Sequence, residues 1–164
     1  MLIVVTGLPG TGKTTIAEAL AKEVDAVVFS TDKIRKMIFE KPVYDEEDKR
    51  IVYNELFSQT GKYLAVGKSV ILDGTFYTKV LRERAKEVGK SFCEKVFFVY
   101  CDTPEDLLKE RINKRKDEFS DADYSVYLKI KKIFEEFEED VIIIDTSNPV
   151  NTNIDIIKTR IYSM

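Results

Sequence analysis

The sequence predicts an α/β fold in which helices cover both faces of a parallel sheet. Short apolar runs rich in valine and isoleucine alternate along the chain with longer segments whose apolar residues recur at helical spacing. Consecutive strands joined by helices pair in parallel, and a parallel sheet needs cover on both faces. A glycine-rich segment between the first apolar run and the first helical segment fits the strand–loop–helix unit of such folds. The 164 residues are expected to form one domain, 1–164.

Five apolar segments are predicted as strands because each is short, continuous and rich in β-branched or aromatic residues. They cover about residues 2–5, 26–29, 70–72, 95–101 and 141–144. Ligands of parallel sheets sit beyond the carboxyl ends of the strands, so the residues directly after each strand are candidates for a site. These residues are the glycine-rich segment and the segments 30–32, 73–75, 102–103 and 145–147.

The helices in the first half of the chain are predicted from apolar spacing and from residues that favour helix ends. A helix over about residues 12–24 follows the glycine-rich segment. The next begins at Ser30-Thr31-Asp32 and ends near residue 39, since Pro42 follows. Helical patterns over about 46–66 and 79–88 are expected to end at Gly67 and Gly89.

The helices in the second half start from an equally clear signal. Thr103 is predicted as a helix cap and Pro104 as the first helical residue, with acidic residues in the first turn. The polar stretch 116–123 is predicted as a loop. Apolar residues at helical spacing then predict an amphipathic helix over about 126–137 and a last helix over about 154–161.

The segment between the first strand and the first helix matches G-x-x-x-x-G-K-[ST], the phosphate-binding loop of nucleoside-triphosphate enzymes. It consists of Gly7, Leu8, Pro9, Gly10, Thr11, Gly12, Lys13, Thr14 and Thr15. Its glycines bring backbone amides close to phosphate oxygens, and the helix N-terminus that follows favours an anion. Lys13 is expected to reach the β- and γ-phosphates, Thr14 to ligate Mg²⁺, and Thr15 to add a flanking hydroxyl. A glycine turn with a chance lysine is disfavoured by the strand–helix context.

The composition restricts the classes of function. The net charge of −3 argues against a broad basic surface for nucleic acid, although a substrate held at one phosphate is still allowed. The absence of histidine excludes imidazole bases and ligands. Cys93 and Cys101 lack a metal-type spacing and are expected to be reduced core thiols. The first apolar run is too short for a signal peptide and no run could cross a bilayer, so a cytoplasmic protein without a membrane partner is expected.

On these motifs, the chain resembles the small P-loop kinases, and among them the group related to polynucleotide 5′-hydroxyl kinase domains and zeta toxins. The resemblance covers nearly the whole chain and rests on the phosphate loop, segments 30–35 and 72–75, and two arginines, Arg111 and Arg115. It implies a three-layer P-loop kinase fold with a five-stranded parallel sheet in the order 2-3-1-4-5. It also implies a lid over about residues 111–124, with ATP and Mg²⁺ as cofactors.

Polynucleotide kinases commonly carry an asparagine a few residues after the aspartate of strand three. The corresponding segment here is Gly74-Thr75-Phe76-Tyr77, which has no asparagine. This departure argues against a nucleic-acid acceptor.

Phosphoryl transfer requires positioning and charge neutralisation more than covalent chemistry. Asp32, in the first turn of a helix at the open end of the sheet, is the candidate for orienting the acceptor hydroxyl and accepting its proton. A helix cap is the alternative role for this residue. Arg35 lies on the same helix face and is the candidate for holding an anionic part of the acceptor, with an exposed surface arginine as the alternative.

Three further residues are expected near the phosphates. Asp73 ends strand three, beside strand one in the implied order, so its carboxylate is expected to support Mg²⁺, most simply through water. Arg111 and Arg115 share one helix face and are candidates for clamping the phosphates as charge spreads in the transition state. A solvated basic face is the alternative for the two arginines.

Three functions compete at this point. The favoured one is an ATP-dependent kinase that phosphorylates a hydroxyl of a small-molecule acceptor. The second is a polynucleotide 5′-hydroxyl kinase, which would add a nucleic-acid groove to the same core. The third is a nucleotide-binding NTPase or switch, in which Asp32 and Arg35 would have no acceptor to hold.

Overall fold

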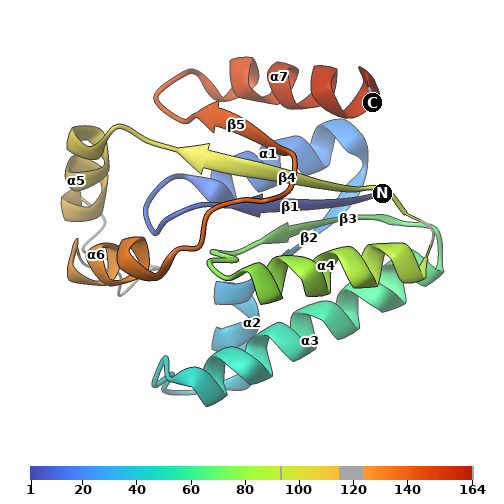
Figure 1. Cartoon of the computed structure of the whole chain (residues 1–164), viewed down its shortest axis with the longest axis horizontal. Helices are drawn as coiled ribbons and strands as arrows, with labels where there is room; N and C mark the ends of the chain where they lie inside the picture. Colours follow the sequence, from blue (N-terminus) through green and yellow to red (C-terminus); the bar gives the residue numbers. More distant parts are fainter. Residues whose placement is uncertain (93, 115–123, 164) are drawn as a thin grey trace.

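The computed structural model describes residues 1–92, 94–114 and 124–163, and the statements below concern these residues. They form a five-stranded parallel sheet in the order β2-β3-β1-β4-β5, which confirms the predicted fold class and strand order (Figure 1). The strands are β1 Leu2–Thr6, β2 Ala26–Ser30, β3 Ser69–Asp73, β4 Val96–Asp102 and β5 Val141–Asp145.

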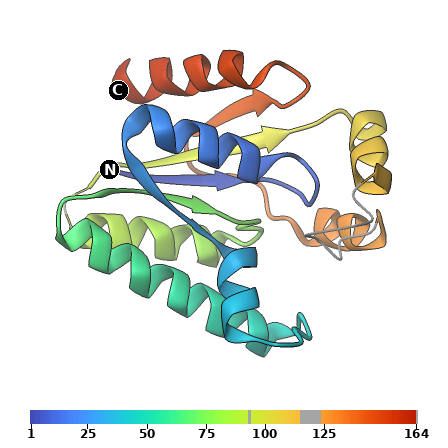
Figure 2. The same cartoon turned by 180° about the vertical axis from the view of Figure 1, so that it is seen from behind.

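Helices lie on both faces of the sheet and at its carboxyl end. They are α1 Lys13–Val24, α2 Thr31–Ile38, α3 Glu46–Ala65, α4 Lys79–Ser91, α5 Glu105–Lys114, α6 Tyr124–Ile133 and α7 Val150–Ser163. Helices α1 and α7 cover one face, and α3 and α4 cover the other, while α5 and α6 stand beyond the ends of the strands (Figures 1 and 2).

The core is divided in two by the sheet. Side chains alternate along each strand, so Ile3 and Val5 of β1 pack with α1 and α7, whereas Leu2 and Val4 pack with α3 and α4. All four side chains are fully buried. Burial on both faces explains why the strands are continuous apolar runs rather than alternating ones.

Two predicted helix ends were wrong. Helix α4 continues past Gly89 to Ser91. Gly89 serves close packing rather than helix termination, because a Cβ there would lie 2.2 Å from Val96 Cγ2 of the neighbouring strand. Helix α6 ends at Ile133 rather than at residue 137. Phe134 and Phe137 keep helical spacing but leave the helix to pack their rings 5.7 and 5.5 Å from that of Tyr100.

The predicted start of the fifth helix was also shifted. Helix α5 begins at Glu105, and the hydroxyl of Thr103 instead lies 3.4 Å from the carbonyl oxygen of Thr11 and 2.5 Å from the hydroxyl of Thr146. Cys101 is a buried free thiol, as predicted, and burial raises its pKa to about 12. Cys93 and the predicted loop at 116–123 lie outside the described residues.

Candidate active site

The glycine-rich loop connects β1 to α1 at the carboxyl end of the sheet (Figure 1). Gly12 ends the loop at φ +84°, a left-handed conformation that favours glycine. A Cβ at Gly7 would lie 2.7 Å from the carbonyl oxygen of Cys101, so the loop backbone runs directly against β4. Helix α1 has no side-chain cap, which leaves its first N–H groups suited to an anion.

Side chains of the loop hold its shape. Lys13 Nζ donates to the carbonyl oxygen of Leu8 at 2.9 Å, and Thr11 Oγ1 donates to the same oxygen at 2.8 Å. Both bonds close the loop on itself at Leu8. The ammonium group of Lys13 is therefore held over the loop, where it can meet a phosphate with little rearrangement.

Asp73 and Thr14 meet at the end of β3, as the implied strand order predicted. Thr14 Oγ1 donates to Asp73 Oδ2 at 2.7 Å, and Asp73 is only 3% exposed. Burial raises the pKa of Asp73, while Lys13 and the Thr14 hydroxyl oppose this shift and the Asp32 carboxylate adds to it. Lys13 and Asp32 therefore both lie within electrostatic range of Asp73.

These oxygen atoms fit Mg²⁺, which prefers hard oxygen ligands and keeps much of its water. In the part of the chain that the structure describes, no group of three or more histidine, cysteine or acidic side chains could hold a metal alone. One hydroxyl and one carboxylate suit an ion that is shared with phosphates and water.

The burial of Asp73 predicts a pH-dependent stability. Because its pKa is raised in the folded state, that state retains a proton which the unfolded chain releases, and stability falls as the pH rises from about 3.8 through the raised value. Asp73→Asn removes the charge and can still accept from Thr14. The variant should resist urea better than the unaltered protein at pH 7, without nucleotide, and this advantage should shrink below pH 3.8. An advantage that is the same at every pH would contradict the burial argument.

Asp32 and Arg35 are paired on α2. Arg35 Nη1 donates to Asp32 Oδ1 at 3.1 Å, with the carboxylate side chain 62% exposed and the guanidinium side chain 10% exposed. The guanidinium carbon lies 4.9 Å from the ring centre of Tyr44. Arg35 Nε is buried without a hydrogen-bond partner among the described residues. The surface-arginine alternative is wrong, because Arg35 is buried.

Sequence reasoning did not find a cluster of aromatic and basic side chains from α3 and the loop after β3. Lys49 Nζ, from α3, lies 5.2 Å from the ring centre of Tyr77. Burial raises the pKa of Tyr53 most. Tyr77, Arg35 and Asp32 are close enough to affect that pKa as well. These residues come from separate elements, so no local motif joins them. The one available signal was the position of Tyr77 shortly after strand three.

Arg111 lies on the other side of the phosphate loop. Its guanidinium donates to the hydroxyl and carbonyl oxygens of Thr146 at 3.1 and 2.8 Å. A Cβ at Gly12 would be 3.7 Å from Arg111 Nη1, which places the guanidinium beside the loop. Thr146 also donates to the carbonyl oxygen of Asp102 at 3.0 Å, so the ends of β4, β5 and α5 are joined here. Arg115 lies outside the described residues.

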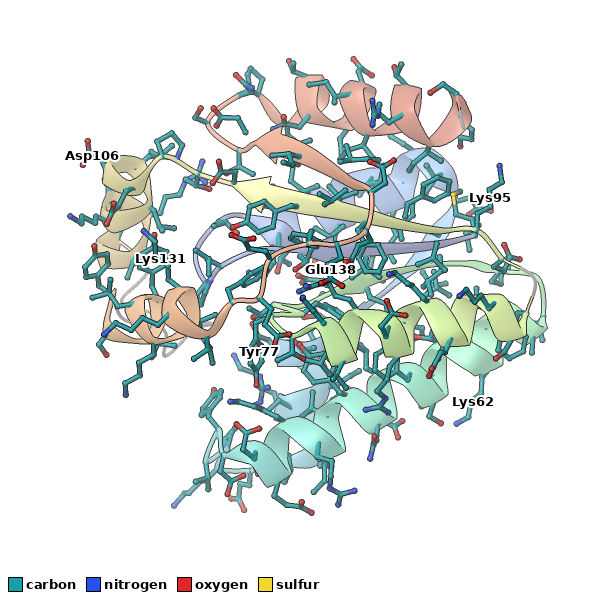
Figure 3. The ribbon with its side chains drawn as sticks, viewed as in Figure 1. Lys62, Tyr77, Lys95, Asp106, Lys131 and Glu138 are labelled. Atoms are coloured by element: carbon teal, nitrogen blue, oxygen red, sulfur yellow. The ribbon has the colours of Figure 1, made fainter. Side chains whose placement is uncertain are left out.

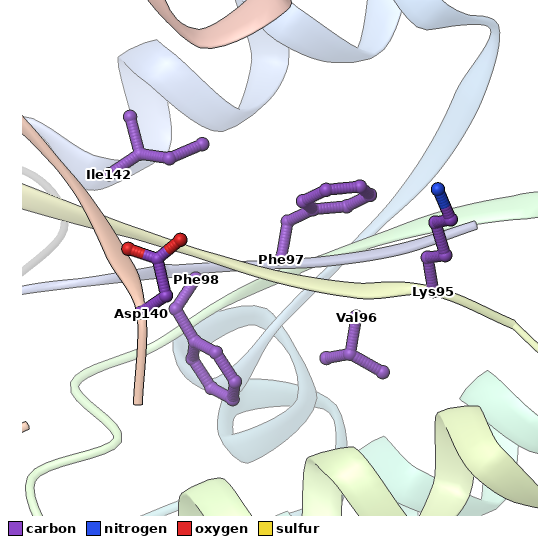
Figure 4. A pocket seen from close by; sticks show the side chains of 6 residues that line it. All are labelled: Lys95, Val96, Phe97, Phe98, Asp140 and Ile142. Atoms are coloured by element: carbon purple, nitrogen blue, oxygen red, sulfur yellow. The ribbon is translucent and has the colours of Figure 1, made fainter. Parts of the chain in front are cut away.

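A cavity of about 260 Å³ lies at the other end of the sheet. It is lined by Lys95, Val96, Phe97, Phe98, Asp140 and Ile142, at the starts of β4 and β5 (Figure 4). The phosphate loop follows the opposite, carboxyl end of β1. The candidate site is therefore defined by converging polar side chains and not by this hollow.

The family model described as AAA domain (AAA_33) matches residues 2–137. An uncharacterised protein of Mycobacterium tuberculosis is 31% identical over 133 residues, covering 74% of this chain and 27% of its own length. The L-seryl-tRNA(Sec) kinase of Methanococcus maripaludis is 28% identical over 148 residues, covering 84% of this chain and 52% of its own length. The chain thus spans about a quarter to a half of these curated relatives.

Solved structures share the fold. A sugar kinase from Janibacter superposes with a TM-score of 0.76 and 24% identity, covering 96% of this chain and 92% of the other. The Mycobacterium tuberculosis APS kinase, solved with AMPPNP and APS, superposes with a TM-score of 0.70 and 16% identity, covering 96% of both chains. Over the described residues, no helix has both the length and the apolar character needed to cross a membrane.

Proposed function

We propose a function from the premise that this chain belongs to the AAA domain family, and that its fold is that of the P-loop kinases. It is a kinase that transfers the γ-phosphoryl group of ATP to a hydroxyl of a small-molecule acceptor. One observation carries the proposal: Ser30 at the end of β2 pairs with Asp73 at the end of β3, so a second carboxylate, Asp32 in the first turn of α2, lies next to the Lys13 and Asp73 site. A kinase needs such a carboxylate to orient the acceptor hydroxyl.

The phosphate loop, Gly7–Thr15, would cradle ATP, with Lys13 at the β- and γ-phosphates. Arg111, and Arg115 beyond it, would neutralise the charge that spreads over the transferring group. Thr14 and Asp73 would hold Mg²⁺, which neutralises phosphate charge when bound. Residues 1–164 would form one kinase domain, with a lid over about residues 111–124.

Asp32 would accept a hydrogen bond from the acceptor hydroxyl and take its proton as the reaction proceeds. The new bond joins the acceptor oxygen to the γ-phosphorus, and the bond from that phosphorus to the bridging oxygen breaks, leaving ADP. Arg35, whose Nε has no protein partner among the described residues, would hold an anionic part of the acceptor. Tyr77, which meets Lys49, lies with Arg35 and Asp32 within electrostatic range of Tyr53.

The second candidate is a kinase for a hydroxyl carried by a nucleic acid, including a polynucleotide 5′-hydroxyl. The relative named L-seryl-tRNA(Sec) kinase favours it. The net charge of −3 and the missing asparagine after Asp73 favour a small acceptor.

An acceptor screen with ATP labelled at the γ-phosphate tests the proposal. The panel contains gluconate, shikimate, adenosine 5′-phosphosulfate, nucleosides, seryl-tRNA and a 5′-hydroxyl oligonucleotide. We expect label on a small acceptor, with a KM that responds weakly to salt because few phosphate contacts are made. Label on the oligonucleotide or on seryl-tRNA alone would favour the second candidate, and release of phosphate without any labelled acceptor would favour an NTPase.

A further inference from the structure

Arg82 of α4 is a fully buried cation that joins its helix to two other segments. Its Nε donates to the carboxylate of Glu139 at 2.9 Å. Its Nη1 donates to the carbonyl oxygen of Phe76 at 3.0 Å, and its Nη2 donates to the carbonyl oxygens of Glu135 and Glu136 at 3.1 and 2.8 Å. A buried guanidinium requires such partners, so these bonds specify where each segment lies.

The first of these segments is residues 134–139, which we call the strap. The strap continues directly from α6 and leads to β5. It is held at α4 by Arg82, whose guanidinium carbon lies 5.9 and 4.5 Å from the ring centres of Phe134 and Phe137. In Figure 3 the strap with Glu138 runs above the start of α4, and Tyr77 lies beside the same end of that helix.

The second segment is residues 74–77, which we call the acceptor loop. Phe76 has φ +46°, a backbone conformation that residues other than glycine rarely adopt. Its N–H donates to the hydroxyl of Tyr53 at 3.2 Å, its carbonyl accepts from Arg82, and its ring is fully buried. Both peptide groups of the strained residue are therefore held by side chains from α3 and α4.

Three successive carbonyl oxygens of the acceptor loop are held by three different elements. That of Thr75 accepts from Thr6 of β1 at 2.5 Å, that of Phe76 accepts from Arg82, and that of Tyr77 accepts from the N–H of Glu135 in the strap at 2.8 Å. The loop starts at Asp73 and passes so close to α2 that a Cβ at Gly74 would lie 2.8 Å from Thr31 Cγ2.

We infer that Arg82 is a positioning residue for phosphoryl transfer: it fixes the acceptor loop, which follows Asp73 and packs against α2 next to Asp32, and it ties that loop to the strap after α6. The inference rests on the proposed function. A displacement of the loop would move Asp32 relative to Asp73, and small displacements of this kind slow catalysis strongly. Nucleotide binding would be spared, because the hydrogen bonds of Arg82 go to the strap and the acceptor loop rather than to the phosphate loop.

The test compares Arg82→Lys with Arg84→Lys in the full chain. Arg84 lies on the same helix, over the ring of Phe57 and bonded to Asn54, but it does not hold the acceptor loop. With the panel acceptor that the unaltered protein phosphorylates fastest, Arg82→Lys should lower kcat about tenfold and leave the Kd for ATP within about threefold. Hydrogen exchange should rise in residues 74–78 and 134–139 and stay unchanged in 7–15. Arg84→Lys should change none of these quantities.

A second variant carries the test if Arg82→Lys does not fold. Tyr53→Phe removes only the hydroxyl that holds the N–H of Phe76, and should lower kcat about fivefold with faster exchange in residues 74–78. Its control is Tyr63→Phe on the same helix, where the ring packs against Phe29.

Unchanged kcat in both test variants, or equal losses in test and control variants, overturns the inference and leaves the kinase assignment standing. Equal losses of ATP binding and of transfer also overturn it. If the unaltered protein phosphorylates nothing in the panel, the proposed function fails, and the inference fails with it.

Discussion

Replacing Lys13 with alanine should lower phosphoryl transfer at least about a hundredfold, the scale for losing a preorganised charged donor. The ammonium group is held over the phosphate loop by the carbonyl oxygen of Leu8, so it requires little reorganisation to stabilise charge on the β- and γ-phosphates. The rate of transfer from labelled ATP, measured at saturating ATP and Mg²⁺, gives the effect directly.

The control is Lys22→Ala, an exposed lysine in the last turn of the same helix. That variant should keep full activity, and thermal unfolding should show that both variants fold. Near-normal turnover in a folded Lys13→Ala variant would refute the assignment of Gly7–Thr15 as the phosphate loop.

Replacing Asp32 with asparagine should lower transfer to the acceptor about a hundredfold or more, within the range for acid–base and orienting groups. The amide keeps the size of the carboxylate and can still accept from Arg35, but it cannot take a proton. The Kd for ATP should change by less than about threefold, because Asp32 is expected to contact the acceptor and not the nucleotide. Single-turnover transfer and ATP titration measure the two quantities separately.

The matched control is Asp106→Asn, another aspartate in the first turn of a helix, on α5. Arg35→Ala should differ in kind and mainly raise the KM of an anionic acceptor. If Asp32→Asn lowers ATP binding and transfer equally, the acceptor-site interpretation is wrong and a plain NTPase or switch becomes the better account.

Local sequence patterns were sufficient to predict the strand–loop–helix unit that contains the phosphate loop and the order of the strands and helices along the chain. The loop, the strands and most helix starts depend on interactions within a few residues, such as glycine conformations, apolar spacing and caps. Apolar spacing did not predict the structure where a side chain suits both a helix and another packing environment. Phe134 and Phe137 fit a helical stripe, yet they lie in the strap, where their rings pack against Tyr100, and that of Phe137 also against Arg82.

The candidate site shows the same division. Asp32 and Arg35 are three positions apart, and their place on one helix face followed from helical geometry, whereas the structure shows that they pair. Thr14 and Asp73 are 59 positions apart, and only the implied strand order allowed their meeting to be expected.

The sequence by itself determined the phosphate loop, the alternation of strands and helices, and the carboxylates that follow strands two and three. The tertiary structure alone decided that Arg82 rather than Arg84 is buried, and that it meets Phe76 and a carboxylate 57 positions away. Both arginines lie on one helix in similar local sequence, so spacing cannot tell them apart. Burial depends on which segments the chain brings back over the helix, and that path is set by the packing of the whole sheet and its helices.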